Sequence, residues 1–170
     1  MKQAPRSQAP VGVCFVRGVD ERRAIIRDAA VRLLARREHS RLELARKLGS
    51  RGHPDDLIEE TVADLADDGL QSDDRFAQAF VRSALGRGQG PLRIRAGLAE
   101  RGINSDIAST YFDLDADEWR ERAASALYKR FGSAPVESRA DWARRARFLA
   151  GRGFPSDVAA KVLGSLDRVP

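Results

Sequence analysis

A five-residue motif, Leu-x-x-Arg-Gly, occurs three times in the chain, at 48–52, 98–102 and 149–153. The copies are 50 and 51 residues apart, and each is followed by a capping-type residue, an acid and an apolar residue, at 55–57, 105–107 and 156–158. Glycine accepts the left-handed backbone that ends many helices, and an acid favours the first turn of the next helix. A helix stop and start that recur about every fifty residues predict tandem helical repeats.

The stretch 33–52 places a helix end, a helix start and a helix stop close together. Arg36-Arg37 ends one helix, and Ser40 with Glu43 three residues later has the form of a capping box. In that motif the serine caps a backbone N–H and the glutamate side chain reaches back to the serine N–H. Arg51-Gly52 then ends the second helix.

Apolar residues recur at helical spacing throughout the chain, and nowhere do they alternate as in a strand. We therefore predict an all-α fold of three tandem three-helix repeats, which stack into an elongated, curved rod. The predicted repeats are 21–71, 72–114 and 115–170, preceded by a flexible tail at 1–20. The expected helices are about 21–37, 41–50, 55–69, 73–86, 92–101, 106–114, 115 or 117 to 131, 138–150 and 156–166.

The chain has 170 residues, a net charge of +5 and an isoelectric point of about 10.0. A basic chain favours an acidic partner, nucleic acid first. Of its 30 basic residues 26 are arginine, which suits phosphate and carboxylate, although codon usage in a G·C-rich genome gives the same bias. A single cysteine, Cys14, excludes an internal disulfide, and neither a signal peptide nor a membrane-spanning run is recognisable. We expect a cytoplasmic protein.

No group of residues has the pattern of a catalytic, metal or cofactor site. The two histidines and one cysteine lack zinc-ligand spacing. The acids at 67–68 and 73–74 fit helix ends better than a Mg²⁺ site. The glycine-rich loop at 86–90 lacks the strand that precedes a phosphate-binding loop, so a plain helix–helix turn is the stronger interpretation. We predict no enzyme activity, no cofactor and no metal.

Basic residues gather at three places that suit a polyanion or an acidic protein surface, although most surface arginines are simply solvated or paired with an acid. The first lies in the tight turn after 35, the second flanks the glycine loop, and the third lies in the helix predicted at 138–150. The candidate partner-binding residues are Arg36, Arg37 and Arg41; Arg82, Arg87, Arg93 and Arg95; and Arg144 and Arg145.

Several stretches together resemble the RecX family, which regulates the RecA recombinase. The resemblance begins with LLARREHSRLELARKL and continues through LADDGL at 65–70, DDRFA at 73–77 and FVRS at 80–83. It resumes with G-x-G-P-L-R-I at 88–94 and L-x-x-R-G-I at 98–103, and in all covers 24–166. One departure is Ala84-Leu85, where family members often carry another arginine.

The resemblance implies a modulator, in most cases an inhibitor, without catalytic activity of its own. Such proteins lie in the groove of the RecA filament on single-stranded DNA, block strand exchange and ATP hydrolysis, and damp the coprotease role of RecA in the SOS response. The implied partners are therefore the RecA filament and single-stranded DNA, contacted directly or through RecA, with no membrane. We expect a monomer. The alternative from the residues alone is an autonomous DNA-binding helical-repeat protein.

Overall fold

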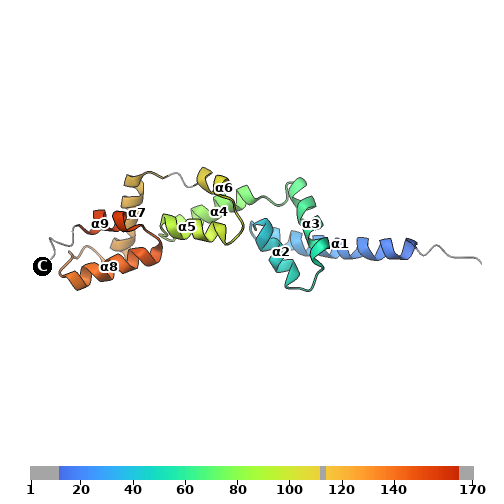
Figure 1. The fold of residues 1–170 in the computed structure, drawn as a ribbon, viewed down its shortest axis with the longest axis horizontal. Coiled ribbons are helices and arrows are strands. Elements are labelled where there is room, and N and C mark those ends of the chain that lie inside the picture. Colours follow the sequence, from blue (N-terminus) through green and yellow to red (C-terminus); the bar gives the residue numbers. More distant parts are fainter. Residues whose placement is uncertain (1–11, 112–113, 165–170) are drawn as a thin grey trace, which may run out of the picture. The chain divides into compact units, whose positions relative to one another are not determined.

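The computed structural model describes residues 12–111 and 114–164. All secondary structure in these ranges is helical, which confirms the predicted all-α class (Figure 1). The helices are α1 (Gly12–Leu34), α2 (Arg41–Gly49), α3 (Asp55–Asp67), α4 (Asp73–Gly86), α5 (Pro91–Ala99), α6 (Ser105–Thr110), α7 (Ala116–Phe131), α8 (Arg139–Arg152) and α9 (Ser156–Leu163).

Helix α1 begins nine residues earlier than the sequence predicted. Of the predicted tail at 1–20, residues 1–11 lie outside the described part of the chain, and 12–20 belong to α1. Pro10 is the last proline before this helix, so nothing in the sequence after it interrupts the backbone hydrogen bonds. Val19, at helical spacing from Ile26, packs against the core, which gives this early turn a packing role.

The three repeated glycines have the left-handed backbone that their position predicted. Gly52, Gly102 and Gly153 have φ values of 81°, 74° and 88°. Among the described residues every positive φ belongs to a glycine. The repeated motif is therefore a helix terminator in all three copies.

The predicted capping box at Ser40 and Glu43 is only half correct. Ser40 Oγ accepts a hydrogen bond from the Glu43 backbone N–H at 3.1 Å. The Glu43 carboxylate instead binds the side chains of Arg37 and His39. A complete capping box occurs at the start of α7, where Asp115 accepts from the Glu118 N–H at 2.8 Å and Glu118 accepts from the Asp115 N–H at 3.0 Å.

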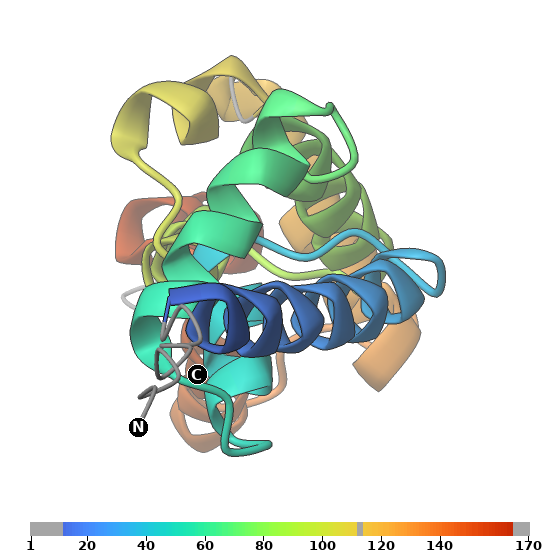
Figure 2. The same ribbon diagram turned by 90° about the vertical axis from the view of Figure 1, so that its right-hand side faces the viewer.

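The chain divides into two compact units, Met1–Gln71 and Ser72–Pro170, called here the N-terminal and C-terminal units. In the N-terminal unit α1 and α2 both pack against α3, as the crossing of α1 and α3 in Figure 2 shows. Its core contains Ile26, Leu44, Leu48 and Leu65, all fully buried. Arg23 and Arg27 of α1 bind Asp64 and Asp68 at 2.6 and 2.7 Å along the same contact.

In the C-terminal unit a single core runs through α4, α5, α7, α8 and α9. Trp119 of α7 meets Phe154 edge-on, with ring centroids 6.3 Å apart. The start of α5 lies against the end of α8, because the N–H groups of Gly90 and Leu92 donate to the carbonyls of Arg152 and Gly153 at 2.8 and 3.0 Å. A Cβ atom on Gly90 would lie 2.6 Å from the Gly153 backbone, so this contact requires glycine.

Candidate functional site

The first predicted basic group is exposed: Arg36 and Arg37 lie in the turn after α1, and Arg41 is the first residue of α2. The guanidinium of Arg37 donates to both carboxylate oxygens of Glu43, at 3.0 and 2.7 Å. A bidentate ion pair of this kind fixes the side chain and neutralises its charge. Arg37 is therefore less available to an external anion than the sequence predicted.

Glu43 also contacts buried His39, whose Nδ1 lies 3.0 Å from the second carboxylate oxygen. Burial lowers the pKa of His39 below its usual range, and the charge of Arg37 lowers it further. Burial alone would raise the pKa of Glu43, but its hydrogen bonds to Arg37 and the positive charge beside it lower the pKa overall. This cluster joins the interhelical turn to α2 and has a structural role.

The second predicted group surrounds the loop at 86–90, which forms the turn between α4 and α5. Arg82 is exposed on α4, Arg87 donates to Ser83 Oγ, and Arg93 donates to the Gly151 carbonyl at 2.8 Å. The last glycine of the loop donates its N–H to the Arg152 carbonyl. The loop is thus a helix–helix turn that also docks against the end of α8.

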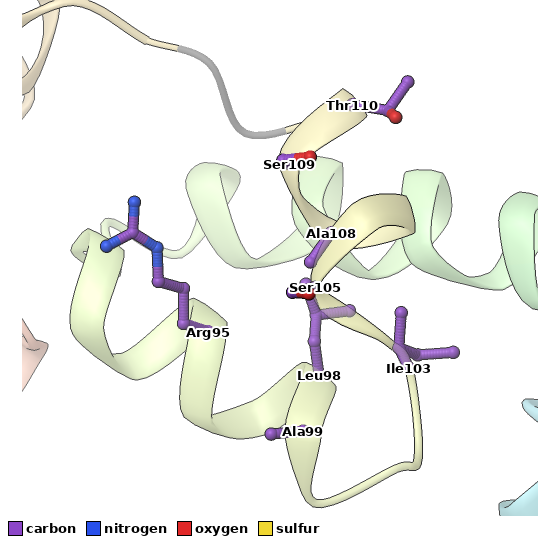
Figure 3. A pocket seen from close by; sticks show the side chains of 8 residues that line it. All are labelled: Arg95, Leu98, Ala99, Ile103, Ser105, Ala108, Ser109 and Thr110. Carbon is purple, nitrogen blue, oxygen red and sulfur yellow. The ribbon is translucent and has the colours of Figure 1, made fainter.

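Arg95, the fourth member of this group, lines a depression of about 690 Å³ over α5 and α6. Figure 3 shows its side chain extending from α5 on the side where Ser109 and Thr110 of α6 lie. Leu98 and Ile103 line the apolar part of the depression. Arg93 and Arg95 therefore lie on different surfaces of α5. Arg93 binds the end of α8, whereas Arg95 lines the depression beside α6.

The third predicted group separates into one surface residue and one core residue. Arg144 is exposed and binds Asp141 at 2.7 Å. Arg145 is buried, binds Asp141 at 2.9 Å and donates to the carbonyls of Ala134 and Pro135 at 2.8 and 3.0 Å. Because its guanidinium serves the fold in this way, we leave Arg145 out of the candidate interface.

A basic groove that the sequence did not predict lies in the C-terminal unit. It has a volume of about 310 Å³ and is formed by the turn after α4, one face of α7 and the end of α8. No carboxylate lines it in the described part of the chain. The basic residues that line it are Arg87, Arg122, Lys129, Arg130 and Arg152.

Charge is distributed unequally between the two units. The N-terminal unit has 13 Lys and Arg against 12 Asp and Glu, whereas the C-terminal unit has 17 against 13. Arginines of α1 are also paired with acids, as Arg23 and Arg27 show. The excess positive charge of the chain thus belongs mainly to the C-terminal unit.

The acids at 67–68 and 73–74 occupy helix ends. Asp68 caps α3 and binds Arg27, and Asp73 and Asp74 lie in the first turn of α4. Within 12–111 and 114–164, no three His, Cys, Asp or Glu side chains are grouped so that they could hold a metal ion. The helices described there are also too short or too polar to cross a membrane.

Tandem three-helix repeats define the class of helical-repeat proteins. Three family models match the chain in order: the first three-helix domain of RecX at residues 27–65, the second at 72–110 and the third at 116–163. The chain belongs to the RecX family. The tandem arrangement of three helical domains that the sequence predicted is thereby confirmed.

Curated relatives carry the same family name. The regulatory protein RecX of Chromohalobacter salexigens is 51% identical over 128 residues, which cover 75% of this chain and 84% of that protein. The regulatory protein RecX of Halorhodospira halophila is 40% identical over 142 residues, which cover 84% and 88%. These relatives are thus named as regulatory proteins.

Two crystal structures support the fold. RecX from Lactobacillus salivarius matches with a TM-score of 0.69 and 24% identity, over 88% of this chain and 99% of that one. A second structure, of regulatory protein RecX, matches with a TM-score of 0.77 and 19% identity, over 92% and 80%. At this level of identity the two structures support the fold alone.

Proposed function

We propose that this protein binds the RecA filament on single-stranded DNA and inhibits its recombinase, ATPase and coprotease activities. It acts as a regulator without catalytic activity of its own, in the cytoplasm and as a monomer. The observation that carries the proposal is the match to all three RecX domains in their order along the chain. A helical-repeat protein with an unbalanced positive charge suits a groove lined by phosphate and acidic protein, where weak contacts add up.

The proposal is tested by ATP hydrolysis of RecA on single-stranded DNA, titrated with this protein at fixed salt. Inhibition is expected. A fall at amounts far below one per RecA favours capping or disassembly of the filament, and a fall near one per RecA favours coating of its groove. ATP hydrolysis that does not change at saturating protein would contradict the proposal.

The basic groove favours a second candidate, autonomous binding to DNA. Such a protein binds bare single strands as tightly as the filament, and its affinity falls steeply with salt. The proposed filament regulator instead prefers the filament strongly over the same strand without RecA. Comparing the two affinities at one salt concentration separates these functions.

A further inference from the structure

We infer that the basic groove of the C-terminal unit binds the phosphodiester backbone of a single nucleic-acid strand. The inference deepens the proposed function, on which its role at a filament rests, by assigning direct contact with the strand to particular residues. The groove is defined by Arg87, Arg122, Lys129, Arg130 and Arg152.

The groove is built from three segments far apart in the sequence, and a hydrogen bond joins two of them. Arg152 at the end of α8 donates to the Arg87 carbonyl at 2.7 Å, across the turn after α4. The guanidinium of Arg152 also lies 5.2 Å from the ring centroid of Phe148. Because a guanidinium has five N–H donors, Arg152 keeps donors for a ligand after making this bond. The structure therefore holds the guanidinium of Arg152 in place before any ligand binds.

Small residues leave room for a backbone to approach the cations. A Cβ atom on Gly86 would meet nothing within 4 Å, and one on Gly88 would meet only the Ala126 Cβ, at 3.8 Å. Ser125 and Ala126 supply the corresponding part of α7. These small residues therefore leave space between the basic side chains, which suits close contact with a sugar–phosphate chain.

The cations on α7 extend too far for one small anion. Arg122 and Lys129 are seven residues apart on one face of the helix, which corresponds to about 10 Å along its axis. Arg130 continues the row in the last turn of α7. A row of this length matches several phosphates in succession rather than a single phosphate or a nucleotide.

Charge favours a nucleic acid over an acidic protein surface. Five cations meet in the groove without a lining carboxylate in the described residues. A nucleic-acid strand supplies dense negative charge, and cations that neutralise it release condensed counterions. A protein surface seldom presents so many acids without bases among them, and the arginines elsewhere on this chain show the mixed pairing that such surfaces use.

The test measures binding of the full chain to a fluorescent 20-nucleotide oligo-dT by anisotropy, over a range of salt concentrations. The groove variant is Arg122→Gln, Lys129→Gln and Arg130→Gln. The matched control, Arg139→Gln, Arg147→Gln and Lys161→Gln, removes the same charges from exposed positions that do not line the groove. Circular dichroism checks that each variant folds, and the single change Lys129→Glu replaces the triple variant if that one does not.

We expect the groove variant to bind at least about tenfold more weakly near 0.1 M salt, and the control to change by less than about threefold. The slope of log affinity against log salt should become shallower by about two in the groove variant, since each lost phosphate contact on a single strand contributes about 0.7. Equal losses in the two variants would overturn the proposal.

Two further arms distinguish the sources of the ligand. Inorganic phosphate and pyrophosphate are compared with chloride at equal ionic strength, and no specific displacement of the oligonucleotide is expected. Specific displacement would instead identify a compact phosphate site and overturn binding of a strand.

The RecA ATPase is measured in parallel with all variants. A groove variant that keeps DNA binding but no longer inhibits RecA would overturn the proposal in favour of an acidic protein surface. A wild-type protein that leaves the ATPase unchanged, beside a groove variant that loses DNA binding, would support the groove and contradict only the proposed function.

Discussion

At the scale of single residues, Arg144 and Arg145 are neighbours that both bind Asp141 but differ in burial. The Arg145 side chain is 9% exposed and that of Arg144 is 63% exposed. Arg145→Ala leaves the carbonyls of Ala134 and Pro135 without their donor, so we expect the free energy of unfolding to fall by about 3 kcal/mol. Arg144→Ala should cost less than about 1 kcal/mol.

Urea unfolding followed by tryptophan fluorescence compares these two variants, since both tryptophans lie in the C-terminal unit. Equal midpoints would contradict the structural role of Arg145.

The pair also shows what a sequence alone does not distinguish. Adjacent arginines in a helix are equivalent in composition, and only tertiary contacts distinguish the one that is buried.

His39 gives the N-terminal unit a pH dependence. Its pKa is lowered in the folded protein, first by burial and then by Arg37, from an ordinary value of 6.5. As the pH falls through about 6.5, the unfolded chain takes up a proton that the folded protein does not bind, so the free energy of unfolding decreases. Above that pH the contribution of neutral His39 is fully present.

We expect His39→Gln to reduce the loss of stability between about pH 7.5 and pH 5.5, measured by urea unfolding with far-UV circular dichroism. Glu43 does not produce this effect, because its pKa lies below an ordinary value of 4.5 and its contribution is lost only at lower pH. The control replaces the other histidine, His53, with Gln. If the His39 variant has the same pH dependence as the wild type, the assignment is wrong.

At the scale of elements, the junction of α5 and α8 depends on Gly153. A Cβ atom there would lie 2.5 Å from the Arg93 backbone nitrogen, and φ is 88°. Gly153→Ala should cost about 1 kcal/mol for the left-handed backbone and a further 1–3 kcal/mol or so for the overlap. Gly88→Ala, in the same unit with φ of 69° and an ordinary contact, should cost only the first amount.

Thermal unfolding followed by fluorescence tests this difference. Similar melting temperatures for the two alanine variants would show that the junction can move apart at little cost. A larger fall for Gly153→Ala is expected, because the overlap involves the Cβ and backbone atoms of Arg93, which cannot move aside as the end of a flexible side chain can.

Most of the helices were predictable because their start and stop signals are local. Ser72, Asp115 and Ser138 cap α4, α7 and α8 through side-chain hydrogen bonds to nearby N–H groups. The start of α1 was missed because 12–20 has no cap and a composition that also suits a tail. The partner of Glu43 was missed because a capping box and an ion pair with Arg37 use the same side chain.

The candidate site was less predictable than the fold. The sequence identified Arg87 but not its neighbours in the groove, since Arg122 and Arg152 are 35 and 65 residues away from it. Spacing along α7 could have suggested that Arg122 and Lys129 share a face. Nothing local indicates that the end of α8 meets them, because that depends on the docking of Gly90 against Gly153.

At the scale of the whole molecule, the two units have separate cores, and Trp119 and Trp142 both lie in the C-terminal unit. Tryptophan fluorescence therefore reports on one unit, whereas far-UV circular dichroism reports on both. A two-state transition requires the two urea unfolding curves to coincide. Because the units have separate cores, we expect these curves to differ. Superimposable curves would show that the units unfold together.

Core substitutions sharpen this test. Leu44→Ala in the N-terminal unit should cost about 2–5 kcal/mol and shift the dichroism curve while leaving the fluorescence midpoint in place. Leu149→Ala, equally buried in the C-terminal unit, should shift the fluorescence midpoint. A fluorescence shift caused by Leu44→Ala would reveal coupling between the units.

The contact between Gly90 and Gly153 also determines how the chain can be exchanged between relatives. We expect residues 72–170 to be exchangeable only as one block. A chimera that joins the second repeat of one protein to the third repeat of another must match both glycines and the backbone around them. A crossover at Gln71 and Ser72 leaves that contact intact. Gene shuffling within this family should therefore yield folded hybrids more often at that boundary than between the second and third repeats.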